Sequence, residues 1–111
     1  MKESWLRQKG KEFWWGKRFL GILNIEKKQF ITWRKQKHFF IKYQGWGFNR
    51  ELINKLISLN IQEIILIYRN SNNTETLFKI TPKEVRERGI KIKESYFEDQ
   101  LIVEVKYFKK D

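Results

Sequence analysis

Residues 33–48, WRKQKHFFIKYQGWGF, hold the densest set of side chains that could contact a charged, aromatic ligand. These sixteen residues contain three Lys, one Arg, the only His of the chain, two of its five Trp, three Phe and one Tyr. Lys and Arg neutralise phosphates, and aromatic rings stack on nucleic-acid bases. The stretch therefore predicts a nucleic-acid-binding surface, for DNA or RNA.

We expect two kinds of contact with nucleic acid, one made by ring-bearing side chains and the other by basic side chains. His38, Phe40 and Trp46 are predicted to stack on bases. Trp46 stands between Gly45 and Gly47, and packing of its ring onto the core is the equal alternative. The residues predicted to contact phosphates are Lys9, Lys11, Lys17, Arg18, Arg34, Lys35, Lys37 and Lys42.

The charge is concentrated in the first half of the chain. The protein has 111 residues, a net charge of +11 and no Cys. Residues 1–50 hold 13 Lys and Arg against 3 Glu, and all five Trp. A charge that served only solubility would be scattered, whereas a concentrated positive charge favours an anionic partner, with nucleic acid first.

A nuclease is the first alternative function. His38 is a lone histidine, and no second acid or base is placed beside it by the sequence spacing. On a strand, Glu104 and Lys106 would share a face, where the carboxylate could hold a divalent cation. Glu104-Val105-Lys106 resembles the Glu-x-Lys motif of the PD-(D/E)xK nucleases. That resemblance implies an α/β core, a Mg²⁺ cofactor and further acidic ligands, for which Asp99 and Glu51 are the candidates.

Other classes of function have less support. We find no phosphate-binding glycine loop, and the absence of Cys excludes a Cys-based zinc site, so no small-molecule or metal cofactor is indicated outside the nuclease alternative. No apolar run reaches the length of a membrane span, and the N-terminus lacks a signal-peptide pattern, so we expect a cytoplasmic protein. The second alternative is a protein-interaction module, including a homodimer, that uses the Trp-rich N-terminus.

Composition also hints at the source. The chain has no Ala and is rich in Ile, Lys, Asn and Phe. This bias is typical of AT-rich genomes, and the Lys and Glu content without Cys is compatible with a thermophile. We therefore expect a virus or mobile element of a thermophile as the source.

The elements that must position these residues follow from periodicity and caps. Residues 1–21 are predicted to form a basic aromatic arm, with a short helix from Ser4 to Lys9 that ends at Gly10. A domain of residues 22–111 follows. Strands are predicted at 22–26, 29–34 and 38–43, and residues 44–47 are predicted to form a loop.

In the second half of the chain, the sequence predicts two helices and two hairpins. Asn49 caps a helix over residues 50–59, and the Thr81-Pro82-Lys83-Glu84 box begins a short helix over 82–88. Strands 62–69 and 74–80 form one hairpin, and strands 90–97 and 101–109 form another. The predicted fold class is α+β, a mainly antiparallel sheet of hairpins with helices on one side.

Overall fold

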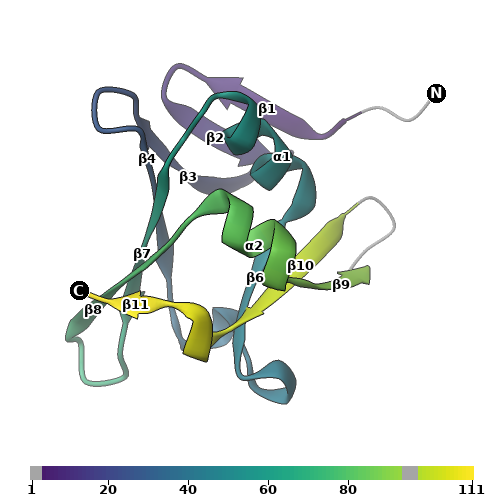
Figure 1. Ribbon diagram of the computed structural model, residues 1–111. Coiled ribbons are helices and arrows are strands. Elements are labelled where there is room, and N and C mark those ends of the chain that lie inside the picture. Colours follow the sequence, from purple (N-terminus) through teal and green to yellow (C-terminus); the bar gives the residue numbers. More distant parts are fainter. Residues whose placement is uncertain (1–3, 94–97) are drawn as a thin grey trace.

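The computed structural model describes residues 4–93 and 98–111. It contains a seven-stranded sheet, a four-stranded sheet and two α-helices. Figure 1 shows both helices on the same side of the long strands β4 and β7, and no helix or strand of the described residues covers the other side. The expected α+β class with hairpin-rich, mainly antiparallel sheets is confirmed.

The seven-stranded sheet runs in the order β1-β2-β3-β4-β7-β8-β11. Its one parallel pair is β4–β7, which aligns Phe30 with Ile64 and Thr32 with Leu66. Phe30, Ile64 and Leu66 are at most 1% exposed, so this pair forms the centre of the sheet. The strands are β1 (Leu6–Lys9), β2 (Glu12–Trp15), β3 (Arg18–Asn24), β4 (Gln29–Arg34), β7 (Glu63–Arg69), β8 (Glu75–Ile80) and β11 (Lys109–Lys110).

The four-stranded sheet is fully antiparallel. In the sequence, its strands come in two pairs that are inserted between strands of the larger sheet. Its order is β5-β6-β10-β9. Of its three short 3-10 turns, η1 and η3 carry the chain between the two sheets, and η2 joins β5 to β6 within the smaller one. The elements are η1 (Gln36–His38), β5 (Phe39–Phe40), η2 (Ile41–Tyr43), β6 (Gly45–Asn49), β9 (Ile90–Lys93), β10 (Asp99–Glu104) and η3 (Val105–Tyr107).

Both predicted helices are confirmed together with their caps. α1 (Arg50–Ser58) begins at Asn49, whose Oδ1 accepts a hydrogen bond from the Leu52 amide at 2.9 Å. α2 (Pro82–Arg88) begins at Thr81, which exchanges two hydrogen bonds with Glu84 in a capping box. These bonds satisfy amides that the first turn of a helix leaves without partners.

The core between the two sheets is centred on Trp46. Its side chain is 2% exposed, and its ring centroid lies 5.0–5.4 Å from those of four other aromatic residues. The indole Nε1 is buried and has no hydrogen-bond partner. The four aromatic neighbours are Phe39, Tyr68, Phe78 and Phe108.

The predicted helix at the N-terminus is wrong. Residues 6–15 form the hairpin β1–β2, with Gly10 at φ +60° in its turn. Phe13 and Trp15 face the core while Glu12 and Trp14 face outward, so the alternation of a strand governs this segment. The boundary predicted at residue 21 falls inside β3.

The predicted strand 38–43 and the loop 44–47 are also wrong. Only Phe39 and Phe40 form a strand, and Gly45–Asn49 is the buried strand β6. A Cβ on Gly45 would lie 1.9 Å from the Val103 carbonyl oxygen, so glycine is required by the close approach of β10 rather than by a turn.

The C-terminal half agrees with the sequence except at its end. The β7–β8 and β9–β10 hairpins are confirmed, although residues 94–97 of the predicted strand lie outside the described residues. The predicted strand 101–109 is wrong, because β10 ends at Glu104 and η3 carries the chain across to the larger sheet. Asp99 and Gln100, expected in a turn, belong to β10.

We predict that Trp46→Ala lowers the free energy of unfolding by about 3–5 kcal/mol, the usual loss for a large aromatic side chain removed from a core. Trp46→Phe should lose clearly less, because it keeps an aromatic ring in the core and, like the Ala variant, removes an unpaired N–H group whose burial costs about 1–3 kcal/mol. Urea unfolding of the three proteins measures both values. Equal losses in the two variants would contradict the central role of this ring in the core.

Candidate nucleic-acid interface

A cavity of about 180 Å³ lies where β3 and β4 meet the smaller sheet. We call it the β4 cavity. It gathers five of the residues that the sequence singled out, namely Arg18, Arg34, Lys37, His38 and Phe40. The rest of its lining is Phe19, Leu20, Thr32, Trp33, Gly47, Asn49, Leu52 and Gln100.

Arg34 is the central cation of the β4 cavity. Its Nη1 donates to the Gly47 carbonyl oxygen at 2.8 Å, and its guanidinium lies 5.0 Å from the centroid of the Phe48 ring. Burial, together with the positive charge of Arg18, lowers the pKa of Arg34 to about 10. No carboxylate of residues 4–93 and 98–111 forms an ion pair with it. A half-buried guanidinium in this setting would be stabilised by an anionic or acceptor-rich ligand.

His38 ends the turn η1 beside Arg34. Its Nδ1 accepts a hydrogen bond from the Lys35 amide at 2.9 Å, so the neutral ring carries its proton on Nε2. Burial lowers the pKa of His38 below its usual 6.5, and the nearby charges of Arg34, Lys37, Arg18 and Lys35 lower it further. The ring is therefore neutral at pH 7, and it can stack or donate one hydrogen bond.

A buried carboxylate contacts two residues that line the β4 cavity. Glu98 is 5% exposed and forms an ion pair with Arg18. Its Oε1 also accepts a hydrogen bond from Asn49 Nδ2 at 3.1 Å. Because Asn49 is the N-cap of α1, this contact connects the helix start to the cation cluster. The carboxylate balances one charge, and the cavity lining keeps a positive excess from Arg34 and Lys37.

A row of three aromatic rings leads away from the β4 cavity across the uncovered side of the large sheet. Phe19 and Trp33 are 39% and 45% exposed, and their rings stack with centroids 6.3 Å apart. Trp14 contacts Phe19 edge to face at 5.1 Å. We call Trp14, Phe19 and Trp33 the aromatic row. Exposed rings in contact form a platform on which bases stack.

The far end of the aromatic row is also basic. Trp14 lines a second, shallow hollow over the β1–β2 hairpin and the turn that follows β2. The hollow contains two residues that the sequence predicted, Lys9 and Lys17, and two that it did not, Arg7 and Gln8. The aromatic row therefore has cations at both ends.

Some predicted contacts lie elsewhere. Trp46 is buried in the core, so its prediction as a stacking platform is wrong. Lys11, Lys35 and Lys42 are exposed but line neither the cavity nor the hollow. Lys42 instead lies 5.5 Å from the centroid of the Tyr43 ring.

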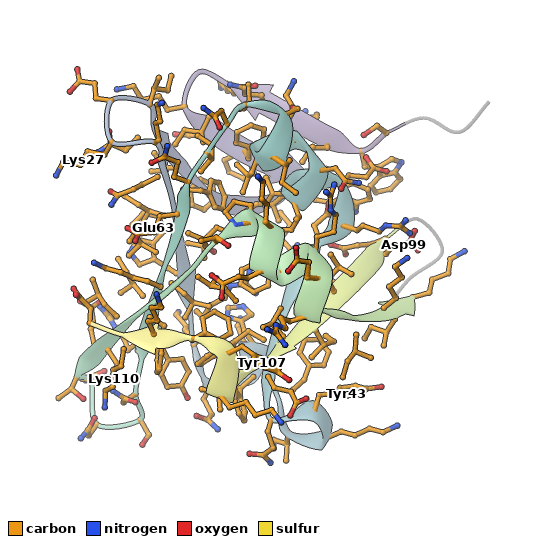
Figure 2. The ribbon with its side chains drawn as sticks, in the orientation of Figure 1. Lys27, Tyr43, Glu63, Asp99, Tyr107 and Lys110 are labelled. Carbon is orange, nitrogen blue, oxygen red and sulfur yellow. The ribbon has the colours of Figure 1, made fainter. Side chains whose placement is uncertain are left out.

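The residues of the nuclease alternative do not form one site. Asp99 and Glu104 occupy the two ends of β10, which at about 3.3 Å per residue separates them by roughly 17 Å. Figure 2 shows Asp99 at one end of β10 and Tyr107 beyond the other end. Lys106 lies in η3, off the strand, and its Nζ is 3.6 Å from Glu104 Oε2. Glu51 accepts a hydrogen bond from Ser4. Within the described ranges, no three His, Asp or Glu side chains are grouped so that they could hold a metal ion.

Several residues of the interface were not predicted from the sequence. Phe19, Trp33 and Trp14 were recognised only as aromatic residues of the first half. Their alternation with buried neighbours on β2 and β4 was the available signal. Gln100 and Asn49 reach the β4 cavity through pairing of β10 with β6, and no local pattern reports that pairing.

Comparisons of the chain with protein-family models, curated protein sequences and solved structures found no match. Among the described residues, no helix has the length and apolar character that a membrane crossing requires. The case for a function therefore depends on the geometry of the β4 cavity and the aromatic row.

We predict that acidification weakens the folded state through His38. Because its folded pKa is lower than 6.5, the unfolded chain takes up the proton first, and the free energy of unfolding falls as the pH drops below 6.5 toward the folded pKa. In His38→Gln this part of the pH dependence should be absent. Urea unfolding from about pH 7.5 to about pH 5.5 measures it, a range where most carboxylates stay ionised. The same pH slope in both proteins would contradict the prediction.

Proposed function

We propose that the protein binds single-stranded nucleic acid along the aromatic row, with the β4 cavity at one end and the basic hollow at the other. The observation that carries the proposal is the exposed Phe19–Trp33 stack at a cavity lined by Arg18, Arg34 and Lys37. Aromatic stacking is tolerant of base sequence, and lysine and arginine contacts follow the phosphate backbone.

A single strand suits this surface better than a duplex. The rings of the aromatic row lie on the face of a sheet, where unstacked bases can reach them, while the bases of a duplex already stack on one another. We do not expect either helix to enter the major groove of a duplex, because α1 and α2 lie on the opposite, core side of the large sheet (Figure 1).

Titration of labelled single- and double-stranded oligonucleotides at two salt concentrations tests the proposal. We expect single strands to bind more tightly, with an affinity that falls steeply with salt. Adding Mg²⁺ should leave the strands intact. Metal-dependent cleavage that is lost in Glu104→Ala would favour the nuclease alternative instead, and no binding at low salt would overturn the proposal.

We predict that Trp33→Ala and Phe19→Ala each weaken single-strand binding by about 1–3 kcal/mol, the usual contribution of one base–aromatic stack. The salt slope should stay unchanged, because no charge is removed. Leu59→Ala is the matched control, since Leu59 is an exposed apolar residue beyond the end of α1 (41% exposed). Weakening of the same size in Leu59→Ala would argue against a specific stack.

Variants that remove a lysine charge should, in contrast, change the salt dependence of binding. Lys37→Gln and Lys17→Gln should each lower the salt slope by about 0.7, the value for one phosphate contact on a single strand. Lys83→Gln on α2 is the control, because Lys83 is exposed on the helical side. A slope that changes equally in all three variants would mean that the charge acts without a defined contact surface.

Protein binding through the same face is the second candidate function. Trp33 on β4 and Leu77 on β8 both pair with Ile67 of β7, so the three side chains share one face of the sheet. Trp33 and Leu77 are 45% and 36% exposed, and apolar surface of this kind is typical of interfaces. This candidate predicts a complex or dimer that survives high salt. Size measurement by light scattering at low and high salt distinguishes it from nucleic-acid binding.

A further inference from the structure

The size of the β4 cavity limits what it can hold. Its volume of about 180 Å³ corresponds to roughly six water molecules at about 30 Å³ each. Pockets for drug-sized ligands occupy about 300–1,000 Å³. A single base or a single phosphate is therefore the largest part of a nucleic acid that the cavity can enclose.

The lining favours a base over a phosphate. Three aromatic residues (Phe19, Trp33 and Phe40) and two leucines line it, and a bare phosphate would gain nothing from their apolar atoms. The strand β6 passes the cavity at Gly47, where an added Cβ would lie 3.1 Å from the Phe40 ring and 2.8 Å from Gln100 Oε1. The bare glycine therefore lets the side chains of Phe40 and Gln100 lie close to this strand.

One neutral polar side chain in the cavity has no hydrogen-bond partner among the described residues. Thr32 donates to the Leu20 carbonyl oxygen at 2.9 Å, and both groups of the Asn49 amide are hydrogen-bonded to Glu98 and Leu52. Gln100 is only 4% exposed, and its carboxamide has no hydrogen bond to any residue of 4–93 and 98–111. Among these residues Trp46 Nε1 is the one fully buried side-chain N or O atom without a partner, so the carboxamide of Gln100 keeps some accessible surface and a ligand in the cavity could bind it.

The second group available to a ligand is Arg34. A guanidinium presents five N–H donors, and the one hydrogen bond that Arg34 makes within residues 4–93 and 98–111 goes to the Gly47 carbonyl oxygen. A Cβ on the same Gly47 would lie 2.8 Å from Gln100 Oε1, so the donors of Arg34 and the carboxamide of Gln100 both lie next to this glycine. Together, the N–H donors of Arg34 and the carbonyl oxygen of Gln100 can form hydrogen bonds with the polar edge of a flat ring.

From these groups we infer that the β4 cavity holds one unstacked base of the bound strand and prefers guanine. The O6 and N7 atoms of guanine are the acceptors that arginine contacts most often, and its N1–H and N2–H₂ groups are donors that the Gln100 carbonyl oxygen can accept. The inference rests on the proposed single-strand binding and adds a base preference at one position to it.

The test uses the full chain and short labelled thymidine homopolymers that carry one central guanine, adenine or cytosine. The ratio of affinities for the guanine-containing and the plain strand should be about tenfold or more, as one bidentate base contact gives. In Gln100→Met, which keeps the side-chain size, the ratio should fall to about one if the carboxamide supplies the contact. Lys83→Gln should keep the wild-type ratio.

A second variant covers the case in which Gln100→Met does not fold. Gly47→Ala places a methyl group against Gln100, Phe40 and Ile102 and should also abolish the ratio. Wild-type binding that is equal for all four strands would overturn the base preference and leave single-strand binding standing. An affinity that responds to a terminal phosphate and not to the base would also overturn it, whereas no binding to any strand would overturn both proposals.

Discussion

The two-residue alternation of β6 is the constraint that the rest of the structure depends on. Along Gly45–Asn49, the side chains of Trp46 and Phe48 enter the core between the two sheets, and Gly47 and Asn49 face the β4 cavity. A slip of one residue in the pairing of β6 with β10 would exchange these faces. It would place a tryptophan in the cavity and leave a hole in the core. Core packing and cavity shape are therefore specified by the same strand.

Electrostatics connects the cavity to the helix that flanks it. The buried Glu98 contacts Arg18 on β3 and Asn49 at the start of α1, so one carboxylate joins a strand, a helix cap and the β4 cavity. Arg34 has no ion pair of its own in the described ranges, and its pKa is lowered first by burial and then by the positive charge of Arg18, before any partner is bound. A cation desolvated next to a like charge lowers the stability of the free protein and favours an anionic partner, which is a common relation between a binding site and the fold that carries it.

Local signals in the sequence predicted the elements that local interactions form. The Asn49 cap, the Thr81–Glu84 box and strand 29–34 all appear as expected, since each depends on neighbours in the chain. Gly45 and Gly47 resemble a loop in the sequence because the need for glycine there is tertiary, namely the close approach of Val103 to Gly45 and of the Gln100 side chain to Gly47. For the site, the sequence identified the cations, whereas Gln100 and the aromatic row needed the strand pairing.

Part of the positive charge lies on the edge strands of the two sheets, away from the proposed binding surface in the case of β9 and β11. The edge strands β1, β5, β9 and β11 are at most four residues long, and three of them carry Lys or Arg, among them Lys91, Lys93, Lys109 and Lys110. An exposed edge is a template for pairing with another chain, and short, lysine-bearing edges resist it because like charges repel. Part of the positive charge is thus placed where it opposes edge-to-edge pairing of two molecules. Neutralising the lysines of these edges, for example by acetylation, would lower the solubility of the protein even with its binding surface intact.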